Sequence, residues 1–288
     1  MKKHLIFWLL ALSLLGCSST GKSPATTFSP VPQQTTAPTG RLTFAGSTTM
    51  QPLVQKLGEA YNQTYPGVAL EIAAGGSSVG IQAAQEGTAD LGMASRQIKP
   101  EERKPGLEVH EIAWDVLAII VHPSNPVQKL TLTQLTEIYQ GKITNWREVG
   151  GKDLPIQPLA RELTSGTRTT FDELVLHGQE LTAKAEVKVT AGEVRATVAT
   201  QPAAIGYVGF GHDNGDDLLI LAIDEVWPTQ KTVAEGKYKL KRPLSLLLGS
   251  LSHPLAQTFV AFALSVKGQE LIAEDGWLAL TNTEISSP

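Results

Sequence analysis

The chain has 288 residues, of which 42% are hydrophobic and 18% charged, and its formal net charge is −4. Residues 1–40 hold three lysines and no acidic residue, which leaves 21 basic and 28 acidic residues, a net charge of −7, in the remainder. A net-acidic body argues against a surface for nucleic acid or for anionic membranes, so an anion would need a local, enclosed site.

The N-terminus has the pattern of an export signal. Two lysines precede a mostly apolar run over residues 5–15, which is too short to remain in a bilayer as a spanning helix. Gly16 and Cys17 follow, and a small residue before a cysteine resembles the lipobox of bacterial lipoproteins. We expect a lipoprotein signal peptide over 1–16 and a lipidated Cys17; the alternative is an ordinary signal peptide. Cys17 is the only cysteine, so no intrachain disulfide is expected.

The segment after the signal is predicted to be a flexible linker. Residues 17–40 are rich in Ser, Thr, Pro, Gln and Ala and contain few large apolar side chains. Such a composition does not bury enough surface to offset the entropy of ordering it. The remaining 248 residues, 41–288, are enough for one large or two small α/β domains.

Short β-rich runs alternate with helical patterns in the first half of this region, which is typical of a mostly parallel sheet covered by helices. Apolar residues at 53, 54, 57, 60 and 61 share one helix face, and Pro66-Gly67 ends that helix. Strands are predicted at 42–45, 68–73, 90–94 and 113–122, and a second helix at 79–86. A Pro-Ser-Asn-Pro segment at 123–126 marks a candidate domain boundary.

A second α/β set follows that boundary. Thr131 and Gln134 predict a capping box for a helix that runs through Tyr139 and is closed by Gly141. The other predicted elements are strands at 156–160, 204–208 and 244–248, helices at 167–177 and 193–200, and a C-terminal helix with Pro254 in its first turn.

Three hydroxyl-rich turns precede predicted helices: AGSTTM (45–50), GGSSVG (75–80) and TSGTRTT (164–170). A helix N-terminus offers unpaired N–H groups and partial positive charge, glycine lets the backbone approach closely, and hydroxyls add donors. Each turn alone is also an ordinary N-cap, but three in one chain favour an anion site. The candidate ligands are Ser47, Thr48, Thr49, Ser77, Ser78, Ser165, Gly166 and Thr167.

Two arginines end predicted strands close to these turns, Arg96 in GMASR and Arg161 in PLAR. A guanidinium is always charged, and each of its charge-assisted bonds to an oxyanion contributes roughly 1.5–3 kcal/mol. Open α/β sheets place their sites at the carboxyl ends of strands, so both arginines are candidate anion ligands. Arg168, inside the first helical turn, is either a ligand or a solvated charge.

Signals for catalysis or metal binding are weak. Residues 76–80 satisfy G-x-S-x-G, with Ser78 as nucleophile and His253 as a conceivable base, but the pattern is loose, stands early in the chain and follows no HGGG segment. The loop G-x-x-x-x-G-K-[ST] is absent. The six histidines show no HxH or HExxH spacing, and HDNGDD (212–217) departs from an EF-hand loop. We therefore expect no metal and no cofactor.

Five segments carry a family resemblance when they are taken together and in order. They read AGSTTMQPL, AAGGSSVGI, TADLGMASR, GKITNWREVGG and RELTSGTRTTF. They resemble the phosphate-binding proteins that deliver substrate to bacterial ABC phosphate importers. The resemblance implies a type II periplasmic-binding-protein fold: two lobes, each a mixed, mostly parallel sheet flanked by helices, and a ligand cleft at a two-strand hinge. It implies lobe 1 over 41–120 and 221–288, and lobe 2 over 121–220.

The resemblance also implies phosphate ligands, position by position. They are Thr48 and Thr49 with Ser47 adjacent, Ser77, Arg161, Ser165, Gly166 and Thr167. Arg96 departs from the family, because well-known members carry an aspartate there that accepts the ligand's proton, and an arginine only donates. Selection against sulfate is therefore left open. The candidate replacement acceptors, among which the sequence does not choose, are Asp90, Asp115, Glu162 and Asp172.

The sequence thus predicts a monomeric, extracytoplasmic phosphate-binding protein without catalytic activity, anchored in a membrane by lipid on Cys17. It would hand phosphate to an ABC permease, which reads the closure of the lobes. The alternatives are the same fold used for sulfate or molybdate, a serine hydrolase or phosphatase that uses Ser78, and a sensor or adhesion protein. Which membrane carries the anchor is left open.

Overall fold

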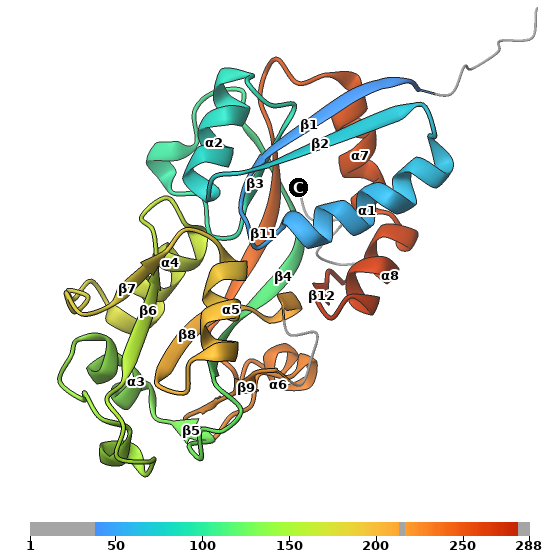
Figure 1. Cartoon of the computed structure of the whole chain (residues 1–288). Coiled ribbons are helices and arrows are strands. Elements are labelled where there is room, and N and C mark those ends of the chain that lie inside the picture. Colours follow the sequence, from blue (N-terminus) through green and yellow to red (C-terminus); the bar gives the residue numbers. More distant parts are fainter. Residues whose placement is uncertain (1–37, 213–216, 282–288) are drawn as a thin grey trace, which may run out of the picture. The chain divides into compact units, whose positions relative to one another are not determined.

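The computed structural model describes residues 38–212 and 217–281, which belong to one unit of 37–288 (Figure 1). The predicted signal peptide, Cys17 and most of the linker lie outside the described residues, as do Asp213 and Asp216 of the HDNGDD turn. Within the described ranges, no helix has the length and apolar character needed to cross a membrane.

Strands and helices alternate in the first part of the unit. They are β1 (Gly40–Gly46), α1 (Gln51–Thr64), β2 (Val68–Ala74), α2 (Ser77–Glu86), β3 (Leu91–Ala94) and β4 (Glu108–Val121). Each matches a predicted element, but β4 begins five residues earlier than the sequence predicts. Its first residues are partly exposed and lack an apolar run, and they are held in the sheet by antiparallel pairing with a strand far along the chain.

The middle of the chain forms a second α/β set. It contains β5 (Lys129–Leu130), α3 (Leu132–Tyr139), β6 (Gln157–Arg161), α4 (Gly166–Phe171), β7 (Glu186–Lys188), α5 (Ala191–Thr200) and β8 (Ala204–Gly209). The predicted capping box is confirmed, since Thr131 Oγ1 accepts from Gln134 N at 3.1 Å and Gln134 Oε1 accepts from Thr131 N at 2.9 Å. The predicted helix at 167–177 is α4 followed by a π-helical turn, Asp172–Leu176.

The last part of the chain adds strands to both halves of the sheet. It contains β9 (Leu219–Ile220), β10 (Ala222–Ile223), α6 (Gln230–Ala234), β11 (Lys241–Leu248), α7 (Pro254–Leu264), α8 (Val266–Glu274) and β12 (Leu278–Ala279). Short 3₁₀ turns lie at Pro100–Glu102, Trp146–Val149 and Phe210–His212. The predicted C-terminal strand and helix are confirmed, and Pro254 is the first residue of α7.

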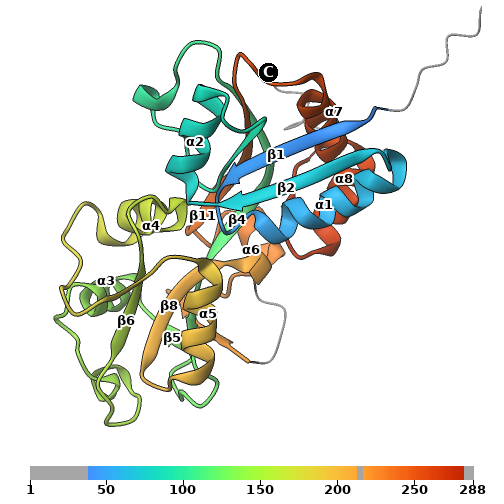
Figure 2. The same cartoon turned by 45° about the horizontal axis from the view of Figure 1, so that its top comes forward.

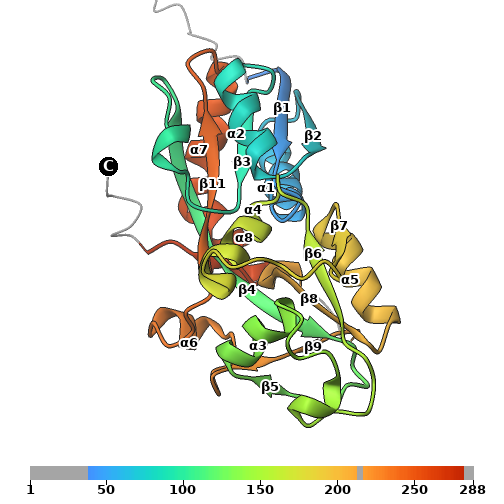
Figure 3. The same cartoon turned by 90° about the vertical axis from the view of Figure 1, so that its left-hand side faces the viewer.

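The main sheet has the order β2-β1-β3-β11-β4-β8-β6-β7. Pairing is parallel between β1 and its neighbours β2 and β3, and between β6 and its neighbours β7 and β8. The central strand β4 is antiparallel to β11 over residues 108–116 and to β8 over 117–121, so one strand passes through both halves (Figure 3).

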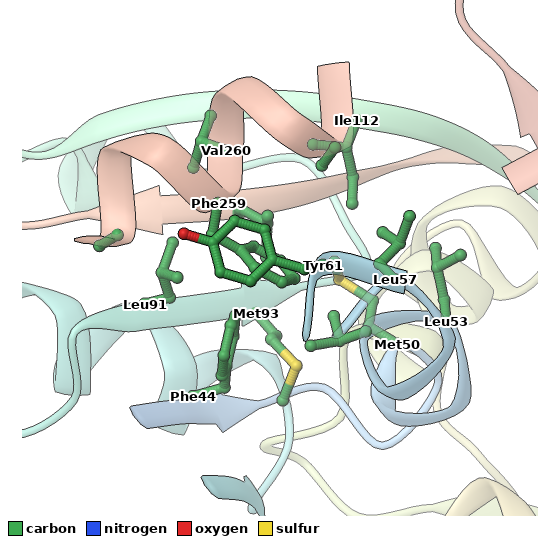
Figure 4. Packing of buried hydrophobic residues seen from close by; sticks show 14 of the residues in the cluster. Phe44, Met50, Leu53, Leu57, Tyr61, Leu91, Met93, Ile112, Phe259 and Val260 are labelled. Carbon is green, nitrogen blue, oxygen red and sulfur yellow. The ribbon is translucent and has the colours of Figure 1, made fainter. Parts of the chain in front are cut away.

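The first hydrophobic core lies between the sheet and helices α1, α7 and α8. The rings of Phe44 and Phe259 meet edge-on with centroids 4.9 Å apart, and Tyr61 packs beside them (Figure 4). Helix α2 covers the opposite face through Ile81 and Ala84 (Figures 1 and 2). The sheet is therefore buried on both faces, as expected for parallel strands.

The second core surrounds the end of β4 with α3, α4 and β8. Phe171 and Tyr207 stack at its centre with 4.0 Å between the ring centroids, and Tyr139 packs against Phe171 at a tilt. Helix α5 covers the other face of the sheet. Two cores on one shared strand confirm the two-lobed α/β class. Leu221 and Tyr238 pack in the second core; the lobe limits given above stay a prediction.

Candidate functional site

Buried hydroxyls from the three predicted turns lie together at the carboxyl ends of the strands. Thr49 Oγ1, between β1 and α1, lies 3.1 Å from Thr167 Oγ1 in the first turn of α4. Ser78 N, in α2, donates to Thr164 O at 3.1 Å. Each of the six central hydroxyl residues is at most 5% exposed; they are Ser47, Thr48, Thr49, Ser77, Ser165 and Thr167. We call these six the hydroxyl cluster.

Glycines allow the turns to approach this closely. Gly76 has a φ of +84°, and a Cβ there would lie 2.6 Å from Thr164 O. A Cβ on Gly166 would clash with Ser77 Oγ and lie 3.0 Å from Ser95 Oγ. Larger residues at either position would separate the α2 and α4 turns, so glycine is required for the contact.

Arg161 is buried against this cluster at the end of β6, with 1% of its surface exposed. Its Nη2 donates to Thr48 Oγ1 at 3.1 Å and to Val189 O at 2.7 Å, and its Nε donates to Lys188 O at 3.3 Å. Among the described residues no carboxylate forms an ion pair with it. Burial lowers the pKa of Arg161 to about 10, which is still far above neutrality, so the guanidinium is charged and carries no matching anion.

Arg96 has a different environment although it also follows a strand. Its guanidinium is 2% exposed and pairs with both carboxylate oxygens of Glu102, at 2.6 and 2.7 Å. Burial opposes ionisation of Glu102, but the hydrogen bonds from Arg96 and Lys99 N hold the pKa of that carboxyl below its ordinary value. Arg96 Nη2 also donates to Ser78 Oγ at 3.2 Å. Within the described residues, Arg96 makes no hydrogen bond to the hydroxyl cluster.

Arg168 is mostly buried, and it contacts the cluster through its backbone, since its N–H donates to Ser165 Oγ at 3.3 Å, while its guanidinium binds elsewhere. Its Nε donates to both oxygens of Asp172 at 2.7 and 2.8 Å, and its Nη1 donates to Arg161 O at 3.1 Å. It therefore supports the backbone of the neighbouring arginine.

The four candidate proton acceptors all have partners. Asp90 accepts from Thr43, Glu162 from Thr164, and Asp172 from Arg168. Asp115 is 1% exposed and pairs with Arg242, whose Nη2 lies 3.4 Å from Thr49 Oγ1. Burial raises the pKa of Asp115, while Arg242 opposes the rise. Of the four, Asp115 is the one whose partner brings a guanidinium to a cluster hydroxyl, because the guanidinium of Arg168, the partner of Asp172, donates to Arg161 O.

Two residues of the site were missed by the sequence reasoning. Ser95 is 1% exposed, accepts from Ser47 Oγ at 2.8 Å and donates its N–H to Ser77 Oγ at 3.0 Å. It stands beside Arg96 in GMASR, and proximity to that arginine was the available signal. Arg242 follows Lys241 at the basic start of β11, KRPLSLLL, and no local signal in the sequence separates it from the neighbouring lysines.

The residues proposed for a hydrolase have separate roles. Ser78 Oγ accepts from Arg96, and His253 caps α7, its Nδ1 accepting from Leu255 N at 3.2 Å. No group of three or more potential metal-ligating side chains occurs in the parts of the chain that the structure describes.

A two-lobed α/β fold with buried hydroxyls and an unmatched arginine between strand ends defines a substrate-binding protein for an anion. A family model described as PBP superfamily domain matches residues 32–267. The phosphate-binding protein PstS of Bacillus subtilis is 31% identical, covering 99% of this chain and 97% of its own length. The phosphate-binding protein PstS of Borreliella burgdorferi is 29% identical, covering 83% and 90%.

Solved structures agree with these relatives. A putative phosphate ABC transporter substrate-binding protein of Clostridium perfringens, crystallised with bound phosphate, has a TM-score of 0.80 and 37% identity, covering 84% of this chain and all of its own. An ABC-type phosphate transport receptor of Vibrio cholerae has a TM-score of 0.68 and 32% identity, covering 83% and 100%. The chain belongs to the phosphate-binding proteins of phosphate ABC transporters. It is a binding protein and not an enzyme.

Proposed function

We propose that the protein binds inorganic phosphate between its two lobes and delivers it to the permease of an ABC phosphate transporter. The observation that carries the proposal is Arg161, a buried guanidinium that contacts Thr48 and has no carboxylate partner among the described residues. A buried charge without a partner is costly, and an oxyanion would supply both the opposite charge and the missing acceptors.

The proposed phosphate ligands are the guanidinium of Arg161, the groups of the hydroxyl cluster and Gly166. Gly166 also lets the α2 and α4 turns come into contact. The hydroxyls and N–H groups donate to phosphate oxygens without adding bulk. Micromolar affinity requires about −8 kcal/mol, which a handful of charge-assisted bonds supplies after ordering costs. Ser78 and Arg96 as direct ligands stay a prediction, since their observed partners are each other and Glu102.

Titration calorimetry of the protein freed of bound anion tests the proposal. Phosphate is expected to bind with a dissociation constant in the micromolar range or tighter, and Arg161→Ala to weaken it about tenfold or more. Sulfate is titrated in parallel, and absence of sulfate heat would indicate that another acceptor replaces the missing aspartate. Equal binding of sulfate would instead favour a general receptor for tetrahedral oxyanions, and no heat with phosphate would contradict the proposal.

Location and partners belong to the same proposal. The apolar run and Cys17 support an extracytoplasmic lipoprotein, held at a membrane by its lipid and acting as a monomer. Closure of the two proposed lobes, 41–120 with 221–288 and 121–220, would be the state that the permease reads. Cells that lack the protein should lose phosphate uptake, and Cys17→Ser should abolish incorporation of labelled fatty acid. Normal uptake in the deletion strain would favour a sensor.

A further inference from the structure

A second buried arginine, Arg242, lies against the hydroxyl cluster on the side of Thr49. It belongs to β11 and is the register partner of Asp115 in β4, the strand shared by both cores (Figure 3). The two side chains are 1% and 0% exposed, with Arg242 Nε and Nη2 at 2.8 and 2.7 Å from Asp115 Oδ2. They form a fully buried ion pair.

The carboxylate of Asp115 has no remaining acceptor capacity directed at a ligand. Its Oδ2 takes two bonds from Arg242, and its Oδ1 accepts from Val116 N at 2.8 Å and from Phe210 N at 3.0 Å. Each carboxylate oxygen has about two lone-pair positions, so four donors fill the group. Asp115 therefore holds Arg242 and does not replace the family's proton-accepting aspartate.

The guanidinium of Arg242, in contrast, has donors to spare. Its Nη2 lies 3.4 Å from Thr49 Oγ1, at the outer limit of a hydrogen bond, and Thr49 Oγ1 in turn lies 3.1 Å from Thr167 Oγ1. Its Nη1 is buried and has no acceptor among the described residues. Arg96 Nε and two other buried atoms of the described residues also lack partners, so the unpaired Nη1 of Arg242 is informative because the same guanidinium adjoins the hydroxyl cluster through Nη2.

The two buried arginines also act on each other. Burial is the main cause that lowers the pKa of Arg161, and the positive charge of Arg242 lowers it further. Among the described carboxylates, only Asp115 forms an ion pair with either guanidinium; the charges of Glu162 and Glu193 act on Arg161 without pairing with it. Arg161 is therefore left without a paired carboxylate from the described residues at the cluster, and an anion with two or more oxygens would supply acceptors to both guanidinium groups.

We propose that Arg242 is a further phosphate ligand, which donates to the anion from the Thr49 side while Arg161 donates from the Thr48 side. The inference rests on the proposed function and deepens it, because it assigns a second cation to the same site. Both arginines would then bind different oxygens of one tetrahedral anion, a geometry that favours tetrahedral over planar oxyanions.

Removal of Arg242 alone does not test the inference, since Arg242→Met leaves the Asp115 carboxylate buried and unpaired beside the anion. The decisive comparison is between Asp115→Asn and the double variant Asp115→Asn/Arg242→Met, neither of which has that carboxylate charge. Phosphate affinity is measured by calorimetry, and thermal unfolding without ligand checks that both variants are folded. If Arg242 is a ligand, the double variant binds phosphate about tenfold or more weakly than Asp115→Asn. Equal affinities would reduce Arg242 to a counter-ion of Asp115 and overturn the inference.

A crystal structure of the wild-type complex with phosphate gives a second answer if the double variant does not fold. A phosphate oxygen within about 3.2 Å of Arg242 Nη1 or Nη2 is expected. A phosphate that contacts Arg161 but not Arg242 would overturn this inference and leave the proposed function standing. Wild-type protein that binds no phosphate would remove both.

Discussion

Arg96 and Arg161 occupy similar places in the fold, each at or just after the carboxyl end of a strand, β3 and β6, and both are almost fully buried. They differ in what surrounds the charge. Arg96 is clamped by Glu102, six residues further along, whereas Arg161 donates to two backbone carbonyls and one hydroxyl. The charge of Arg96, after β3, is neutralised by a carboxylate, whereas the charge of Arg161, at the end of β6, is not neutralised by any described carboxylate.

The comparison shows that strand position determines the burial of an arginine but not its role. Breaking a buried pair is costly because it leaves an uncompensated charge, so Arg96 serves the stability of the loop that carries Glu102. A buried arginine without a carboxylate is suited to bind an anion. The same side chain is structural in one half and available to a ligand in the other.

The largest expected effect is the difference between the two arginines in phosphate binding. Arg161→Met should weaken binding about a hundredfold, because truncation of one partner of a buried charge pair costs about 2–5 kcal/mol. Arg96→Met should weaken it less, and should instead lower the midpoint of thermal unfolding. Calorimetry and thermal unfolding of both variants check this. Equal losses of affinity would break the comparison and make Arg96 a direct ligand, as the sequence first predicts.

A smaller loss of phosphate affinity is expected when the α2 and α4 turns are held apart. Gly166→Ala places a methyl group against Ser77 Oγ and 3.0 Å from Ser95 Oγ. Overpacking of this kind costs about 1–3 kcal/mol, so phosphate affinity should fall on the order of tenfold. The control is Gly192→Ala in α5, where the nearest atom outside the adjoining residues, Thr190 Oγ1, lies 3.9 Å away. A loss of the same size in the control would show that the effect is not specific to the site.

The variant Glu102→Gln tests whether Arg96, unlike Arg161, is neutralised by a carboxylate. Its free energy of unfolding should differ from that of wild type in a pH-dependent way. The pKa of Glu102 is lower in the folded protein than its ordinary value of 4.5, so its contribution to stability is present above that pH and is lost as the pH falls through the folded value. The variant should be about 2 kcal/mol less stable at pH 7 and nearly equal to wild type under acid conditions. Urea unfolding at several pH values measures this, and a constant difference across pH would refute the ion-pair explanation.

The smallest expected effect separates capping from ligand binding. Ser165 and Thr190 each cap a helix, accepting from Arg168 N at 3.3 Å and from Glu193 N at 3.1 Å. Ser165→Ala and Thr190→Ala should each cost about 1 kcal/mol of unfolding free energy. Only Ser165→Ala should also weaken phosphate binding. Equal phosphate affinity in both variants would leave Ser165 as a cap alone.

Much of the fold follows from the sequence because its signals are local. The α3 capping box and the apolar face of α1 depend on residues within one or two turns, and both were predicted. The strands β5, β7, β9, β10 and β12 have two or three residues each, too few for a periodic pattern, and were missed. Their pairing depends on partners far along the chain.

Some features of the site could likewise be predicted from short sequence patterns, and others could not. Hydroxyl turns and strand-end arginines are visible as short patterns, and the structure brings the hydroxyls of all three turns together. The pairing of Arg96 with Glu102 and of Arg242 with Asp115 requires knowledge of tertiary neighbours. Composition cannot reveal which arginine is neutralised, because that depends on a carboxylate within about 4 Å in space.

The lining of hydroxyls has a consequence for how a bound anion is held. A carboxylate accepts and a guanidinium donates, but each hydroxyl rotates and does either. Thr49 and Thr167 already show this ambivalence, since either oxygen can be the donor in the bond between them. A proton carried by the anion therefore finds a hydroxyl acceptor without a carboxylate in the lining. The proton can then lie on any of the anion's oxygens. Release would then depend on mechanical separation of the two halves and not on titration of the lining.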